Sequence, residues 1–182
     1  MYTIEPFLFY VLCEMNEKGA HIVGYFSKNK DFTEGNNLSC ILTLPFYQRR
    51  GFGKYLITLS YELSLIEGKV GTPERPLSDL GRQSYLSWWT QRIIDYMKQK
   101  QGDYSLDDIS KETGIRTLDI IVALENCKLL KKHGNHNYLC SDPQILDSVY
   151  AQCGRPSIPI HAENLHWWPF KLRYYEQDVQ HK

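Results

Sequence analysis

The sequence predicts an α+β fold in which antiparallel strands come first, helices follow, and a helix–turn–helix–hairpin unit comes last. Three observations predict it. Up to Leu44 the chain holds three apolar runs rich in β-branched and aromatic residues, separated by turn residues. From Gly53 the apolar residues recur at helical spacing instead. After Gly102 two short helical patterns precede a Lys-, His-, Gly- and Asn-rich segment typical of a hairpin tip.

Three strands are expected in the N-terminal part. Residues 6–12 form a continuous apolar run, which is typical of a strand covered on both faces. Residues 21–26 follow a turn and are the expected hairpin partner. The third strand covers residues 38–44 and is closed by Pro45. Alternation along this third strand predicts that the side chain of Cys40 is buried.

Two long helices are expected next. The first runs from Gly53 to Gly68 and has its apolar residues on one face, at Leu56, Leu59, Leu63 and Ile66. Residues 71–76 contain two prolines and therefore are not helical throughout. Ser78 then caps a second helix that extends to about Lys100.

A separate unit is expected from residue 102 onward, so the chain divides into residues 1–101 and 102–182. Ser105 and Asp108 resemble a capping box that opens a helix over residues 106–113. A second helix is expected over residues 117–130, with its core face at Leu118, Ile121, Leu124 and Leu129. With the hairpin tip at residues 131–137, this is the outline of a winged-helix unit. The adjacent Trp167 and Trp168 are expected to pack back on the domain.

Composition narrows the classes of function. Lys plus Arg and Asp plus Glu number 21 each, so the formal net charge is zero, which argues against a protein bound mainly to nucleic-acid backbone. The five cysteines form no C-x-x-C pair and no signal peptide begins the chain, which indicates reduced thiols in the cytosol or nucleus. The longest apolar run is too short to span a bilayer.

The segment from Gln48 to Gly53 lies between a predicted strand and a predicted helix. Glycines there let the backbone approach a ligand, and the helix N-terminus and two arginines add positive charge. These features suit a pyrophosphate group. The segment is not a P-loop, because the pattern G-x-x-x-x-G-K-[ST] is absent, and it is not a dinucleotide fingerprint, because the third glycine is replaced by Leu56. Taken alone, it is also compatible with an ordinary turn that carries exposed arginines.

This loop and its surroundings resemble the MYST histone acetyltransferases, whose acetyl-CoA signature is Q/R-x-x-G-x-G between a strand and a helix. The segments that carry the resemblance are residues 6–10, 24–28, 37–45, 47–54, 60–64 and 73–81. The resemblance is strong to about residue 123 and weaker to residue 169. It implies an acyl-CoA N-acyltransferase (GNAT-like) core over residues 1–101. It also implies a winged-helix-like subdomain of the same catalytic domain over residues 102–182.

The resemblance also implies roles for individual residues. Glu74 matches the family's general base, and Cys40 matches the cysteine beside the thioester. The implied acetyl-CoA contacts are the backbone of Ile41, Leu42 and Thr43 for the acetyl and pantetheine arm, the loop residues Gln48, Arg49, Arg50, Gly51, Phe52, Gly53 and Lys54 for the pyrophosphate, and the hydroxyls of Ser78 and Ser87. Histone tails, subunits of a chromatin-modifying complex and a nuclear location are implied as well, as is a role in transcription regulation.

The chain departs from the family pattern upstream of these motifs. The family has there a C2HC zinc finger and strands that carry an autoacetylated lysine, and neither lies within the 182 residues. No metal is therefore expected here. The set Cys127, His133, His136 and Cys140 does not have a usual zinc spacing.

Acetyl transfer requires a neutral amine, whereas a free lysine has a pKa of about 10.4. A base must accept its proton, and Glu74 stands between two prolines that can fix its position. Either the amine attacks the thioester directly, or Cys40 takes the acetyl group first. We favour direct attack, because nothing nearby in sequence lowers the thiol pKa. The oxyanion is expected to meet a backbone N–H near Cys40 or Ile41.

Three functions therefore compete. The first is a lysine acetyltransferase of histones or other proteins. The second is a non-catalytic fragment or scaffold that needs a separate N-terminal part. The third is a winged-helix protein that binds DNA, which is disfavoured because the second helix of that unit carries Asp119 and Glu125 and few positive residues.

Overall fold

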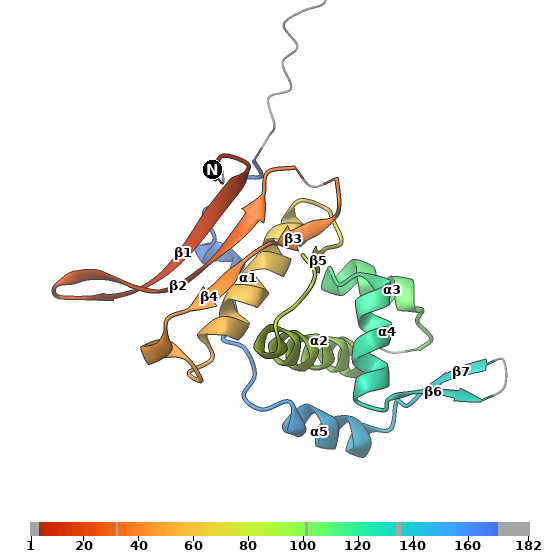
Figure 1. Cartoon of the computed structure of the whole chain (residues 1–182). Coiled ribbons are helices and arrows are strands. Elements are labelled where there is room, and N and C mark those ends of the chain that lie inside the picture. Colours follow the sequence, from red (N-terminus) through yellow and green to blue (C-terminus); the bar gives the residue numbers. More distant parts are fainter. Residues whose placement is uncertain (1–3, 32, 101, 134–135, 171–182) are drawn as a thin grey trace, which may run out of the picture.

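The structure, a computed structural model, describes residues 4–31, 33–100, 102–133 and 136–170. It shows a mixed α/β fold in which a three-stranded sheet lies against α1 and the remaining helices surround α2 (Figure 1). The elements are β1 (Phe7–Asn16), β2 (Gly19–Asn29), β3 (Asn36–Leu38), β4 (Ile41–Thr43), α1 (Phe52–Ile66), β5 (Thr72–Pro73), α2 (Asp79–Gln99), α3 (Leu106–Thr113), α4 (Thr117–Asn126), β6 (Leu130–His133), β7 (His136–Leu139) and α5 (Pro143–Gln152), with 3₁₀ turns at Pro45–Tyr47 and Ala162–Asn164.

The three-stranded sheet has the order β1-β2-β4 and is antiparallel, as predicted. Its first strand is not covered on both faces, so that prediction is wrong. Phe9 and Val11 are exposed because β1 is an edge strand and the described helices pack against one face of the sheet. A continuous apolar run therefore did not indicate a buried strand here.

The predicted third strand is interrupted in the middle by a β-bulge. The Ser27 N–H donates to the Cys40 carbonyl (2.8 Å), while the Ser39 N–H donates to the Ser27 carbonyl (2.7 Å), so two consecutive residues oppose Ser27. Before the bulge, β3 pairs in parallel with β5, and after it β4 pairs with β2. The extra residue reverses the alternation, and Cys40 is exposed instead of buried. The prediction of a buried Cys40 is wrong.

The two long predicted helices are confirmed as α1 and α2, and they share the larger core. The Tyr61 and Trp88 rings stack with centroids 4.5 Å apart. The Trp88 indole donates to the Thr58 hydroxyl (2.8 Å), and the Trp89 indole donates to the Tyr61 hydroxyl (2.8 Å). These bonds satisfy the polar atoms of large aromatic side chains that would otherwise be costly to bury. Ser78 caps α2 by accepting from the Gly81 N–H, as expected.

The C-terminal part has the expected order of helix, turn, helix and hairpin in α3, α4, β6 and β7. The capping box of Ser105 and Asp108 is present in both directions. The second helix ends at Asn126 instead of residue 130, because Lys128 takes a left-handed conformation that cannot continue a helix. Leu118 is 67% exposed, so its placement in the core was wrong, whereas Leu124 and Leu129 are buried as predicted.

The chain returns toward the N-terminal sheet after α5, a helix that the sequence analysis did not predict. Residues that follow α5 cross α1 and α2 and end beside the sheet (Figure 1). The Trp167 indole donates to the Tyr10 hydroxyl (3.2 Å), so this tryptophan packs back as expected. Its neighbour Trp168 is 81% exposed, which contradicts the prediction, because adjacent residues of an extended segment face opposite sides. None of the helices in the described part is long and apolar enough to cross a membrane.

Candidate active site

A cavity of about 600 Å³ lies between the end of β4, the loop before α1, the start of α2 and the segment after α5. Nine of its lining residues are coenzyme contacts predicted from the sequence: Ile41, Leu42, Thr43, Gln48, Arg49, Gly51, Gly53, Lys54 and Ser78. The structure thus brings most of the predicted coenzyme contacts together around one cavity. Arg50, Phe52 and Ser87 are not among its lining residues.

The loop before α1 ends in a glycine that leaves the helix N-terminus open. Gly51 is the N-cap of α1 with φ of 93°, and no side chain caps the helix there. The first N–H of the helix to bond within it is that of Tyr55, which donates to the Gly51 carbonyl (3.1 Å). The N–H groups of residues 52–54 therefore have no partner within the helix and, together with the helix dipole, favour an anion.

The two arginines of this loop have different surroundings. Arg49 lines the cavity and has φ of 59°. The Arg50 guanidinium lies over the rings of Tyr47 (5.4 Å) and Phe52 (5.2 Å) and is 3.8 Å from the Glu14 carboxylate. Arg50 therefore stabilises the conformation of the loop, whereas Arg49 lies at the cavity wall.

β4 presents an open hydrogen-bonding edge to the cavity. Leu44 donates to the Val23 carbonyl (2.9 Å), and the register pairs Tyr25 with Leu42. Because bonded and non-bonded pairs alternate in antiparallel ladders, the N–H groups of Ile41 and Thr43 point away from β2. β4 is an edge strand, so these groups remain available to a ligand. The Gln48 side chain already donates to the Thr43 carbonyl (3.0 Å).

Lys54 is directed at the segment after α5. Its ammonium donates to the Gln91 amide oxygen (2.8 Å) and to the carbonyls of Cys153 (2.9 Å) and Arg155 (2.9 Å). Burial lowers the pKa of Lys54. Ser87 donates to the same Cys153 carbonyl (2.6 Å), so two residues predicted to contact the coenzyme also hold this segment in place.

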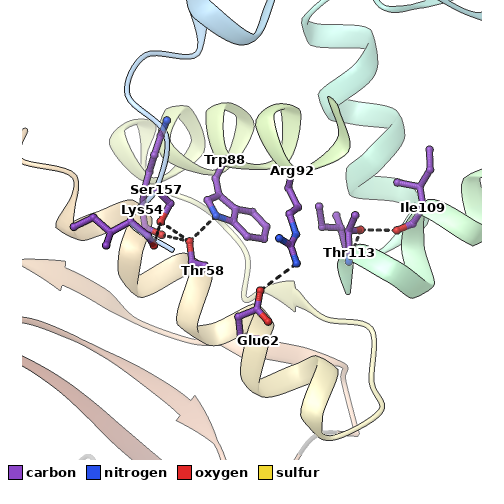
Figure 2. Close-up of polar contacts among 10 residues, drawn as sticks. Lys54, Thr58, Glu62, Trp88, Arg92, Ile109, Thr113 and Ser157 are labelled. Carbon is purple, nitrogen blue, oxygen red and sulfur yellow. Dashed lines mark hydrogen bonds and ion pairs between the residues drawn. The ribbon is translucent and has the colours of Figure 1, made fainter. Parts of the chain in front are cut away.

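Figure 2 shows the neighbouring part of this attachment, which is centred on the Thr58 hydroxyl. This hydroxyl donates to the Lys54 carbonyl (2.8 Å), accepts from the Trp88 indole, and is hydrogen-bonded to the Ser157 hydroxyl (2.7 Å). The Gln91 amide also donates to the Gly154 carbonyl (2.9 Å). Residues 153–157 are thus attached to α1 and α2 through their backbone and one hydroxyl. As a result, the side chains of Cys153 and Arg155 form one wall of the cavity.

Glu74 and Cys40 belong to segments that the structure places side by side. The Glu74 N–H donates to the Leu38 carbonyl (2.8 Å), because β5 runs in parallel beside β3. Both Glu74 and Cys40 are exposed, and Cys40 directly precedes Ile41, which lines the cavity. The Cys40 N–H already donates to the Ser27 hydroxyl (3.1 Å). The free N–H nearest to Cys40 on β4 is therefore that of Ile41.

The sequence analysis missed several residues of the cavity wall. These are Ile57, Leu80, Gly81, Ser84, Tyr85, Cys153 and Arg155. The residues on α1 and α2 could have been found from their helical positions beside Ser78 and Lys54. No local signal pointed to Cys153 or Arg155, because they reach the cavity only through contacts about a hundred residues away in sequence.

No group of three or more His, Cys, Asp or Glu side chains in the described part of the chain is arranged to hold a metal ion. The set Cys127, His133, His136 and Cys140 stays untested, because the two histidine side chains lie outside what the structure describes.

The fold and the site define a mixed α/β protein whose cavity is lined by an edge strand, an uncapped helix N-terminus and a loop that carries Arg49, while Glu74 and Cys40 are not among the lining residues. Comparison of the sequence with known families then shows that the chain belongs to the MOZ/SAS family, which it matches over residues 1–165.

Curated relatives support this placement. The chain is 48% identical over 170 residues to "Histone acetyltransferase of the MYST family 2" of Arabidopsis thaliana, covering 93% of this chain and 38% of that protein. It is 44% identical over 172 residues to "Histone acetyltransferase MOF" of Drosophila melanogaster, covering 92% and 21%. It is 40% identical over 169 residues to "Histone acetyltransferase ESA1" of Yarrowia lipolytica, covering 92% and 36%. The chain therefore spans less than two-fifths of the length of these relatives.

Proposed function

We propose that this chain is a lysine acetyltransferase that moves an acetyl group from acetyl-CoA to the ε-amine of a histone lysine, with Glu74 as general base. The observation that carries the proposal is the cavity of about 600 Å³, whose wall combines the open edge of β4 with the uncapped N-terminus of α1. Under this proposal residues 1–101 are a GNAT-like acyltransferase core and residues 102–182 a winged-helix-like subdomain.

Coenzyme binding follows from the polar groups of that wall. The pyrophosphate accepts from the N–H groups of the loop and the first turn of α1, with Arg49 adding charge. The amides of the pantetheine arm pair with the free edge of β4 at Thr43, as an added strand would, which leaves the Ile41 N–H for the acetyl end of the coenzyme. Arg155 and Ser78 lie at the cavity wall as further contacts.

The chemistry needs a proton acceptor and a stabilised oxyanion. The lysine ammonium gives up one proton to the Glu74 carboxylate, directly or through one water, and the neutral amine then attacks the carbonyl carbon of the thioester. The negative charge that develops on the carbonyl oxygen accepts from the Ile41 N–H, since the Cys40 N–H is bonded to Ser27. The tetrahedral intermediate collapses by breaking the carbon–sulfur bond, and the thiolate of the coenzyme leaves and takes up the second proton of the nitrogen. Direct attack remains the route we favour over acetyl transfer through Cys40.

Histone tails are the proposed substrate, because the relatives are named histone acetyltransferases. On the same basis we propose a nuclear location, a role in chromatin and transcription regulation, and membership of a chromatin-modifying complex. Direct DNA binding by α4 is not proposed, since its Asp119 is bonded within the protein and its Glu125 is exposed.

The test compares the whole chain with its Glu74→Gln variant. Isothermal titration measures acetyl-CoA binding, and a radiolabel assay measures transfer to histone-tail peptides. We expect both proteins to bind acetyl-CoA with similar affinity, and the variant to lose about 10²–10⁴-fold in kcat. Glu125→Gln on the exposed face of α4 is the matched control and is expected to keep the wild-type rate.

Two other outcomes would change the conclusion. Binding of acetyl-CoA without any transfer by the wild-type chain would support the non-catalytic fragment or scaffold. Absence of binding at millimolar acetyl-CoA would refute the assignment of the cavity itself.

A further inference from the structure

We propose that Asp119 of α4 is a positioning residue that holds the loop carrying Glu74, so that the C-terminal unit contributes to the orientation of the base. The inference rests on the proposed function, in which Glu74 accepts the proton of the lysine amine. Asp119 itself contacts neither the cavity nor Glu74. It acts through Thr72 and Arg75, which stand on either side of Glu74 in the loop.

Both carboxylate oxygens of Asp119 are bonded to side chains of the Glu74 loop. The Thr72 hydroxyl donates to Oδ2 (2.6 Å), and the Arg75 guanidinium donates to Oδ1 (2.6 Å). Thr72 stands two residues before Glu74 and Arg75 one residue after it. Charge-assisted bonds of this length are among the stronger ones in proteins, so the loop is held on both sides of the base.

The exposure of the two charged side chains indicates the direction of the dependence. The Asp119 side chain is only 3% exposed, whereas that of Arg75 is 55% exposed. A buried carboxylate is costly unless it is paired and hydrogen-bonded, and the bonds of Asp119 go to this loop. Arg75 could instead be solvated, so the ion pair is not needed to keep the arginine out of an apolar core. What the pair does is fix the backbone between residues 72 and 75.

Backbone contacts complete the attachment of the loop. The Gly71 N–H donates to the Gly114 carbonyl (2.8 Å), and the Arg116 N–H donates to the Gly71 carbonyl (3.2 Å). At the other side the Glu74 N–H is bonded to Leu38 of β3. The base is therefore held between the turn that joins α3 to α4 and the strand that leads to Cys40. A displacement of about 1 Å at such a position can cost about 10²-fold in rate.

The experiment measures Asp119→Asn, an isosteric change that removes the charge, in the wild-type background and in the Glu74→Gln background. We expect kcat to fall about 10–100-fold in the wild-type background, while KM for acetyl-CoA changes less than about twofold. In the Glu74→Gln background the same change is expected to alter the residual rate less than about twofold, because the residue acts through Glu74. Glu125→Gln is the control on the same helix.

Equal losses in both backgrounds would show an independent structural effect and overturn the proposal, as would an unchanged kcat in the wild-type background. Should Asp119→Asn fail to fold, Thr72→Val removes one of the two bonds with little change in volume and is expected to give a smaller loss of the same kind. A full rate for the Glu74→Gln variant alone would show that Glu74 is not the general base. That result would refute the proposed function, and it does not depend on the Asp119 variants.

A second measurement does not depend on activity. Amide hydrogen exchange of residues 72–77 is expected to be at least about tenfold faster in Asp119→Asn than in the wild type, while α1 and α2 keep their protection. Unchanged exchange in this loop would overturn the proposal even if the chain transfers no acetyl group.

Discussion

Lys54 offers a test of what the structure adds to the loop motif. The resemblance assigns it to the coenzyme pyrophosphate, but all three hydrogens of its ammonium group are used, on Gln91, Cys153 and Arg155. We therefore expect Lys54→Met to destabilise the protein in the absence of any ligand. Methionine keeps the length and apolar character of the stem, so that the change removes mainly the three hydrogen bonds.

The expected magnitude follows from those three bonds. Hydrogen bonds to a charged group contribute about 1.5–3 kcal/mol each, which gives roughly 4–9 kcal/mol for three. Ordering a lysine side chain costs about 2 kcal/mol, and burial of the ammonium, which lowers the Lys54 pKa, costs more. The Cys153 carbonyl also keeps its bond from Ser87. We expect a net loss of about 2–4 kcal/mol in the free energy of unfolding, which corresponds to a fall of roughly 4–16 °C in Tm.

The assay combines thermal unfolding without ligand and calorimetric titration of acetyl-CoA at two salt concentrations. Lys54→Met is expected to lower Tm and to weaken coenzyme binding similarly at both salt concentrations, because the wall at Cys153 and Arg155 is displaced. Arg49→Met is the matched control. It is expected to keep Tm within about 1 °C and to bind acetyl-CoA more weakly, mainly at low salt. An unchanged Tm for Lys54→Met, with binding that loses its salt dependence, would refute the reasoning and return Lys54 to the pyrophosphate.

Three further predictions concern the sheet, a half-buried carboxylate and the mechanism. A Cβ at Gly24 would collide with the Leu42 carbonyl oxygen, so Gly24→Ala should push β4 from β2 and cost about 1–3 kcal/mol in denaturant unfolding; wild-type stability would contradict this. Burial raises the pKa of Asp95, so the folded state binds more protons there and loses stability as pH rises above about 4. Asp95→Asn should therefore be more stable than the wild type at pH 7, with a difference that shrinks toward pH 4, and a less stable variant at pH 7 would show that the ionised carboxylate is favourable. Cys40→Ser should keep a nearly normal rate at saturating acetyl-CoA, which would rule out an obligatory acetyl-cysteine, whereas a loss above about 100-fold would contradict this expectation.

Much of the local structure was determined by short stretches of sequence. The change from strand runs to helical spacing near Gly53 located α1, and Ser78 marked the start of α2. The capping box at Ser105 was present as expected. The loop between β4 and α1 was recognisable as a candidate anion site because glycines and a helix start stand together. Such signals lie within one or two turns of chain, where backbone sterics and hydrogen bonding act regardless of what is packed against them.

Only the tertiary structure decided which polar and charged groups are already hydrogen-bonded within the protein. The bulge opposite Ser27 exposed Cys40 although alternation predicted its burial. Lys54 donates to the carbonyl of Cys153, a partner 99 residues away, and Asp119 accepts from Arg75 across 44 residues. Hydrogen-bond donors and charges are satisfied by whatever the fold brings within about 3 Å, and that choice is not encoded in the neighbouring residues. For this chain the sequence therefore indicated which segments line the cavity, and the packing of the C-terminal segments decided which of their side chains are already bonded within the protein.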